Sequence, residues 1–413
     1  MSAKWLIWSA ALGCLTVSAC SAVRGDKARV IPVPPGATPD DLHDAAPSGP
    51  DACEHAGRRF LTSTQPAALG PSAKPGDKYD LLVLTGIGSR SLYAYGLLSG
   101  WSDAGTMPEF QVITGVGGGA YAAVALFAGR EYLADLRRIF LGFDQRKLLR
   151  GDAWDAKRFP HPFGVGTASV ATTDKIRAQT RTVLTAEYFA KVAAEHVKGR
   201  RLYVGTTNLD TQRFVVWDMG AIASQGTAES RKLYEDVVVA STAVPPLLDP
   251  SRIAVAIDGK RYDEMHLEGG VTRSLFWHPP SDAADERSLA GARVHVVLGN
   301  QLYNDPAATK PALLDVTLRS MKAMLLAIQR ADLADLYHTC RDRDMTMRWA
   351  AIPTDYGPSF ETDVFDPAQT AKLYCEGYTR GRDGRAWSDQ PPERAASEDR
   401  PRRGTVFTTG AGR

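Results

Sequence analysis

Residues 112–120 read VITGVGGGA, with Gly115 and Gly119 on either side of position 117. Their pattern predicts a short apolar strand, a tight turn and a buried helix. This is the layout of a nucleophile elbow, G-x-S-x-G, whose strained turn exposes a serine hydroxyl for attack on an acyl group. The central residue is Gly117, so the elbow lacks the atom that would form an acyl-enzyme.

A second glycine-containing turn lies in residues 84–98, where Gly86 and Gly88 separate an apolar run from a helical pattern. Backbone N–H groups at such a helix N-terminus can hold a phosphate or an oxyanion. A dinucleotide site is excluded, because position 91 is serine where the G-x-G-x-x-G motif needs glycine. No acidic residue follows at the required distance of about 20 positions.

The third segment, residues 262–271, carries Glu268 directly before Gly269 and Gly270. An acid followed by two glycines can place a carboxylate where neighbouring backbone approaches closely. Taken alone, the segment is equally typical of a solvated turn.

The three segments, in this order, resemble the patatin-like phospholipases, and the likeness covers most of residues 79–350. Further similar stretches are residues 199–210, 215–223 and 240–245. Members of that family are serine lipid acyl hydrolases with a Ser–Asp dyad, a glycine-rich oxyanion loop and an acid in a D-G-G/A motif. The resemblance implies an α/β fold, a three-layer sandwich with a mostly parallel central sheet and helices on both faces.

Carried over residue by residue, the family pattern puts Gly86 and Gly88 in the oxyanion loop. Ile87 and Ser91 replace two glycines that are usual there, while Arg90 keeps the basic residue common at that position.

The same resemblance puts Gly117 at the nucleophile position and Glu268 at the position of the dyad acid. Glutamate keeps a carboxylate but shifts it by one methylene, on the order of 1 Å, which disturbs a dyad hydrogen bond. Gly117→Ser combined with Glu268→Asp is expected to restore part of the hydrolysis if the elbow backbone accommodates serine. A conformation with positive φ outside the family's strained turn would instead make the serine costly.

The elements that must position these residues alternate along the chain. Strands are expected over 80–84, 110–113, 201–205, 214–217 and 292–298, and helices over 91–98, 119–127, 171–197 and 313–336. Short apolar strands between helices indicate an α/β fold with a covered sheet, formed by a main domain over residues 79–355.

The N-terminus predicts a lipoprotein signal peptide over residues 1–20. Lys4 precedes an apolar stretch, and Val17-Ser18-Ala19-Cys20 resembles the bacterial lipobox, in which the cysteine is lipidated. A transmembrane anchor is the alternative, but residues 5–19 are shorter than the ~20 residues that a span needs. Because Ser21 rather than aspartate follows, we expect an outer-membrane lipoprotein of the cell envelope, facing the periplasm.

Residues 21–78 are rich in proline and glycine and predict a tether, and residues 356–413 are expected to form an extension that is disordered from about residue 380. With Cys20 acylated, three thiols remain, at Cys53, Cys340 and Cys375. Either one pair forms a disulfide, for which Cys340 and Cys375 are the candidates, or the thiols stay free.

The composition narrows the classes of partner. Lys and Arg number 49 and Asp and Glu 47, a formal charge of +2 without a basic run, which argues against nucleic acid. The eight histidines lack metal-ligand spacing, so neither a metal nor another cofactor is expected.

We therefore expect a membrane-anchored, catalytically inactive homologue that binds a phospholipid, an acyl ligand or an unidentified protein partner. The alternative is an active acyl hydrolase, in which Ser89, Ser91, Thr114 or Tyr121 attacks or Glu268 activates water. A scaffold without a ligand pocket is a third possibility, because fold does not fix function.

Overall fold

The computed structural model describes residues 58–60, 79–141, 169, 172–257, 260–277, 289–303, 308–353, 356 and 367–392. The described strands form one nine-stranded sheet. They are β1 (Arg58–Phe60), β2 (Asp80–Gly86), β3 (Val112–Gly117), β4 (Arg201–Asn208), β5 (Arg213–Asp218), β6 (Ser251–Ile257), β7 (Lys260–Glu268), β8 (Arg293–Gly299) and β9 (Thr346–Ala350).

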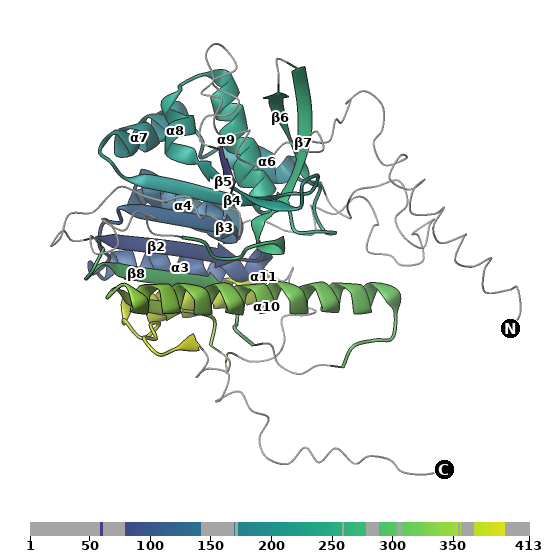
Figure 1. Ribbon diagram of the computed structural model, residues 1–413. Helices are drawn as coiled ribbons and strands as arrows, with labels where there is room; N and C mark the ends of the chain where they lie inside the picture. Colours follow the sequence, from purple (N-terminus) through teal and green to yellow (C-terminus); the bar gives the residue numbers. More distant parts are fainter. Residues whose placement is uncertain are drawn as a thin grey trace, which may run out of the picture.

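The helices are interspersed with the strands along the chain (Figure 1). They are α3 (Ser91–Asp103), α4 (Gly118–Ala128), α5 (Leu133–Leu141), α6 (Asp174–Arg181), α7 (Ala186–Val197), α8 (Met219–Ser224), α9 (Ala228–Ser241), α10 (Leu313–Asp342) and α11 (Pro367–Arg382). Two short 3-10 helices matter for the site, η1 (Gly88–Arg90) and η4 (Gly269–Val271).

The sheet is the middle of three layers, as the period-two alternation of its strands shows. Leu82 and Leu84 of β2 pack into one apolar core with α3, α4 and the helices α7 to α9. Leu81 and Val83 point to the opposite face, into a second core with α10. The expected three-layer α/β fold is confirmed.

The strand order is β1-β5-β4-β3-β2-β8-β9, and within it β4, β3, β2, β8 and β9 run parallel to one another. Antiparallel pairing brings in β5, β1 and the β6–β7 hairpin. The mostly parallel sheet that was expected is therefore observed, with β5 and β7 running against the other strands.

The site forms where β4 changes its neighbouring strand from β3 to β7. The first half of β4, Arg201 to Val204, pairs with β3. From Thr206 onward β4 pairs instead with the end of β7, opposite Glu268. The carboxyl ends of β3 and β7 thus meet beside the same strand.

The C-terminal extension differs from the expectation. Helix α11 packs against α3 so closely that a Cβ on Gly377 would lie 2.1 Å from the Tyr93 carbonyl oxygen. Trp387 then packs edge-to-face against Trp101 of α3, and Trp349 pairs with Ser388. The expected disorder from about residue 380 is wrong for residues 380–392, and the main domain extends beyond residue 355. Local composition predicted disorder here, because the glycine contacts that order the segment are made with α3, a helix far away in the sequence.

Three smaller expectations also change. Residues 58–60, placed in the tether, form β1 and pair with β5. The single helical pattern over 171–197 is two helices, α6 and α7. Cys340 is buried and Cys375 exposed, both as free thiols, so the candidate disulfide is wrong.

The signal peptide, Cys20 and Cys53 lie outside the described residues. Among the residues that the structure describes, no helix is long and apolar enough to cross a membrane.

Candidate active site

Gly117 ends β3 and immediately precedes α4, at a strand-to-helix turn. Its φ is 61° and its ψ is −135°, a conformation that favours glycine and is typical of strained functional turns. The Gly117 N–H donates to Ser241 Oγ at 3.1 Å, and Ser241 Oγ donates to the Gly205 carbonyl at 2.8 Å. The last residue of α9 therefore holds the turn against β4.

The space around Gly117 is closed to a side chain. In the β2–β3 register Gly117 lies opposite Gly86, and a Cβ on Gly117 would lie 2.3 Å from the Gly86 carbonyl oxygen. The same Cβ would lie 2.8 Å from Glu268 Oε1. Backbone cannot yield as a flexible side chain can, so the turn requires glycine at this position.

Glu268, the last residue of β7, points its carboxyl at Gly117 and is only 1% exposed. Among the described residues neither carboxyl oxygen has a hydrogen-bond partner. Burial raises the pKa of Glu268 to about 8, because the charged form loses its hydration. The carboxyl is therefore protonated at pH 7 and cannot accept a proton as a general base there.

The loop between β2 and α3 lies on the other side of Gly117. Gly88 has a φ of +54° and open space around it, whereas Arg90 is buried, which lowers the pKa of its guanidinium. Ile87 is partly exposed and directly precedes η1. Gly86, Gly88 and Gly117 are thus brought together, as the order of the motifs predicted.

Ser91 fills the space that a glycine would leave at the start of α3. Its Oγ would lie 1.9 Å from a Cβ on Gly118 and 2.5 Å from a Cβ on Gly86. In a serine hydrolase the backbone N–H after the nucleophile, here that of Gly118, belongs to the oxyanion hole. The Ser91 side chain is wedged between the two glycine backbones that would form that hole.

Comparison with known proteins identifies the domain. A family model for patatin-like phospholipases matches residues 82–280, which begin within β2 and end beyond η4. Residues 82–280 form a patatin-like phospholipase domain.

Two solved structures are similar at low identity. VipD from Legionella pneumophila is 13% identical with a TM-score of 0.39, covering 79% of this chain and 73% of VipD. The type III effector protein ExoU is 12% identical with a TM-score of 0.34, covering 78% of this chain and 57% of ExoU. A search of curated proteins found no match.

The patatin-like domain has a cavity of ≈ 100 Å³ beside the elbow. Gly88 and Gly118 line it from the two turns, and Tyr121 of α4 and Phe140 of α5 contribute aromatic walls. Engineered apolar cavities of ~150 Å³ bind benzene, so a space of this size fits a short apolar group such as part of an acyl chain.

The alternative nucleophiles of the patatin-like domain are poorly placed. Ser89 and Thr114 are buried, and Tyr121 Oη is 2.7 Å from Thr180 Oγ1 in a buried hydrogen bond. Tyr121 lines the cavity, but burial raises the pKa of its hydroxyl to about 12. A phenol that ionises so far above neutral pH is a weak nucleophile.

A buried hydrogen-bond chain beneath Glu268 was not expected from the sequence. Thr206 Oγ1 lies 3.0 Å from His266 Nδ1, and His266 Nε2 lies 3.1 Å from Glu264 Oε2. The order hydroxyl, imidazole and carboxylate resembles a hydrolase triad. However, Thr206 is fully buried and accepts a bond from Trp217 Nε1 at 2.8 Å, so no substrate reaches it. These hydrogen bonds instead hold β7 against β4 at His266, two residues before Glu268. In the sequence, the alternation of residues along β7 was the only signal that pointed to them.

Proposed function

We propose that the protein is a membrane-anchored patatin-like protein that binds an acyl ligand beside the elbow without hydrolysing it. The closed backbone at Gly117 carries this proposal. The nucleophile is absent, and the Gly86 carbonyl occupies the space that a serine Cβ would need. Hydrolysis of esters by this family depends on that side chain, and the neighbouring backbone offers no replacement.

The carboxyl and the oxyanion loop support the same conclusion. A protonated Glu268 offers a hydrogen-bond donor rather than a base at neutral pH. Ser91 occupies the gap between Gly86 and Gly118, where an oxyanion would be stabilised. The nucleophile, the base and the oxyanion loop thus all differ from those of a working hydrolase, while an apolar cavity is present at Gly88 and Gly118.

Membrane attachment enters the proposal through Cys20, the expected lipidation site of the lipobox-like segment. A lipid anchor would hold the cavity near its source of acyl ligands in the bacterial cell envelope, with the outer membrane as the expected location.

Binding of a fluorescent short-chain fatty acid to the purified protein tests the proposal. We expect saturable binding that Ile176→Phe weakens at least about tenfold, because a larger ring on α6 fills the cavity. Leu209→Phe is the matched control, since Leu209 is exposed away from the cavity lining. Absence of saturable binding, or equal binding by both variants, would contradict an acyl site in this cavity.

A further inference from the structure

The wall of the cavity beside the elbow contains a polar part. Three of the lining residues carry hydroxyl groups that lie together: Tyr121 of α4, Thr180 of α6 and Thr242, which directly follows α9. Tyr121 Oη is 2.7 Å from Thr180 Oγ1, and Thr242 lies beside the same tyrosine hydroxyl. These three residues, called here the hydroxyl trio, decide which group of a ligand can lie against this part of the wall.

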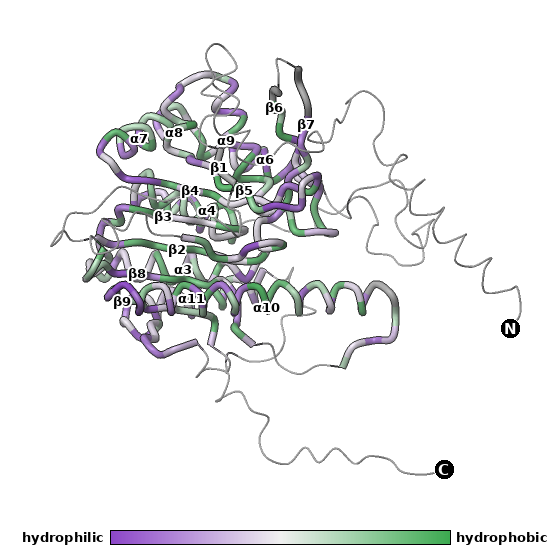
Figure 2. Tube along the Cα trace, in the orientation of Figure 1, coloured by the Kyte–Doolittle hydropathy of each residue, from purple (hydrophilic) through white to green (hydrophobic). Residues whose placement is uncertain are grey.

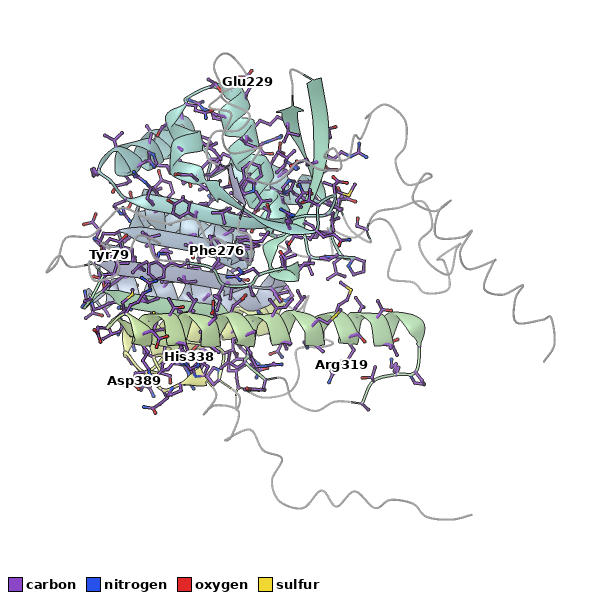
Figure 3. The ribbon with its side chains drawn as sticks, viewed as in Figure 1. Tyr79, Glu229, Phe276, Arg319, His338 and Asp389 are labelled. Carbon is purple, nitrogen blue, oxygen red and sulfur yellow. The ribbon has the colours of Figure 1, made fainter. Side chains whose placement is uncertain are left out.

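The hydroxyl trio belongs to the hydrophilic side of the cavity. Figure 2 shows hydrophilic residues along α6, on which Thr180 is the buried residue. Figure 3 labels Glu229 in the first turn of α9, and Thr242 lies at the opposite end of that helix. Ile139 and Phe140 of α5 line the cavity with apolar side chains. A chain in the cavity therefore meets apolar walls and a polar one.

Each hydroxyl of the trio already donates its proton. A hydroxyl has one proton and two lone pairs, whereas a backbone carbonyl only accepts. Thr180 Oγ1 donates to the Ile176 carbonyl at 2.8 Å. Thr242 Oγ1 donates to the Val239 carbonyl at 2.9 Å. Thr180 therefore accepts in its hydrogen bond with Tyr121, and the tyrosine is the donor.

The other tyrosine of the cavity wall is committed in the same way, because Tyr95 Oη donates to the Gly118 carbonyl at 2.8 Å. The hydroxyl groups that line the cavity thus offer lone pairs rather than protons. Gln179 also lines the cavity and has amide donors, but its side chain is partly exposed, so water competes for them. A ligand that donates a hydrogen bond leaves every existing bond intact, whereas one that only accepts must break one.

A neutral donor suits the hydroxyl trio better than a charged one. Tyr121 and Thr180 are buried, so an ammonium group beside them would lose its hydration. The charges of Arg177 and Glu235 both reach Tyr121, but these two side chains already form an ion pair with each other. A hydroxyl group donates a hydrogen bond without this cost.

We propose that the cavity selects a short acyl chain that carries a hydroxyl group. This inference rests on the proposed function, because it specifies the ligand of the same cavity. The hydroxyl group donates to a lone pair of the hydroxyl trio, while the chain packs against Ile139 and Phe140. Benzene, with six carbons, occupies an apolar cavity of ~150 Å³, so a cavity of ≈ 100 Å³ has room for about four carbons.

Displacement of the fluorescent short-chain fatty acid by three acids of equal chain length tests this inference. Pentanoate ends in a methyl group, 4-hydroxybutanoate has a hydroxyl group in its place, and 3-methoxypropanoate has an ether oxygen that only accepts. We expect 4-hydroxybutanoate to bind at least as tightly as pentanoate. It should bind at least about tenfold more tightly than 3-methoxypropanoate, whose oxygen stays unpaired or breaks an existing hydrogen bond.

A double variant tests whether the hydroxyl trio is the source of this selection. Thr180→Val with Thr242→Val releases the proton of Tyr121, which can then be donated to an ether oxygen. The tenfold difference between 4-hydroxybutanoate and 3-methoxypropanoate should therefore close, while pentanoate still binds. Thr182→Val is the matched control, since Thr182 is exposed outside the cavity lining, and it should keep the difference.

Tighter binding of pentanoate than of 4-hydroxybutanoate to the wild-type protein would overturn this inference and leave the proposed function standing. Equal binding of 4-hydroxybutanoate and 3-methoxypropanoate would also overturn it. So would a difference that persists in the double variant, because the selection would then arise elsewhere. Absence of displacement by all three acids would contradict the acyl site itself, and with it the proposed function.

Discussion

At the scale of single residues, Gly117 does more than lack a hydroxyl. Its positive φ and the Gly86 carbonyl make the position specific for glycine. The space that a side chain would need at this position is occupied by backbone. Simple reinstatement of the nucleophile, which the motif alone suggested, conflicts with this geometry.

We predict that Gly117→Ser destabilises the fold by about 2–4 kcal/mol, because the new Cβ meets backbone and adopts a strained φ. Gly105→Ser is the matched control: its φ is +71° but the space around it is open, so only a backbone cost of about 1 kcal/mol is expected. Urea unfolding measures both. Equal losses of unfolding free energy in the two variants would show that the close contact with Gly86 does not contribute to the cost of the serine.

Glu268 makes the stability of the protein depend on pH. Its pKa rises from 4.5 in the unfolded chain to about 8 in the fold, so the folded state keeps a proton that the unfolded state releases in between. This contribution to stability is present at low pH and is lost as the pH rises from 4.5 to 8.

Glu268→Gln removes that titration. Relative to wild type, the variant should gain stability steadily over this range, reaching about 3 kcal/mol at pH 7. Unfolding curves between pH 5 and 8.5 measure the difference, and a difference that does not change with pH would contradict a buried, protonated carboxyl.

At the scale of elements, the site depends on which strands and helices meet. The order of the glycine turns and of the acid motif resembles that of the patatin-like phospholipases, and this resemblance predicted that Gly86, Gly117 and Glu268 come together, because the dyad analogy requires them to meet. Residues 262–268 could not be recognised as strand β7, since their pairing with β4 is a tertiary contact. The burial that raises the pKa of Glu268 likewise depends on distant packing.

Helix α11 illustrates the same limit. Its polar composition suggested disorder toward its end, but Gly377 and Gly381 let its backbone approach α3, where Gly96 and Gly100 face it in return. Close backbone contact between two helices needs small residues on both, and neither sequence segment shows the other's position.

This contact yields a prediction. Gly377→Ala should cost at least about 2 kcal/mol, because its methyl group would press on the Tyr93 carbonyl, although alanine favours helix formation. Lys372→Ala on the exposed side of α11 should change stability by less than about 0.5 kcal/mol. Thermal unfolding of both variants measures this, and a stable Gly377→Ala protein would contradict the close packing of α11 on α3.

At the scale of the whole molecule, attachment to a membrane depends on the lipobox-like segment ending at Cys20. This segment lies outside the described residues, and its lipidation stays a prediction. We expect Cys20→Ala to abolish incorporation of a labelled fatty acid and to release the protein from the membrane fraction. Labelling and membrane association that persist unchanged would refute lipidation at this cysteine.

The central claim is that the patatin-like domain has kept its acyl cavity and lost its chemistry. Initial rates of p-nitrophenyl butyrate hydrolysis by the purified protein, measured from pH 6 to 9, test it most directly. We predict rates equal to those of buffer at every pH, for wild type and for Glu268→Gln alike. Turnover that rises as Glu268 ionises near pH 8 and disappears in Glu268→Gln would contradict the claim and make Glu268 the base of a working hydrolase.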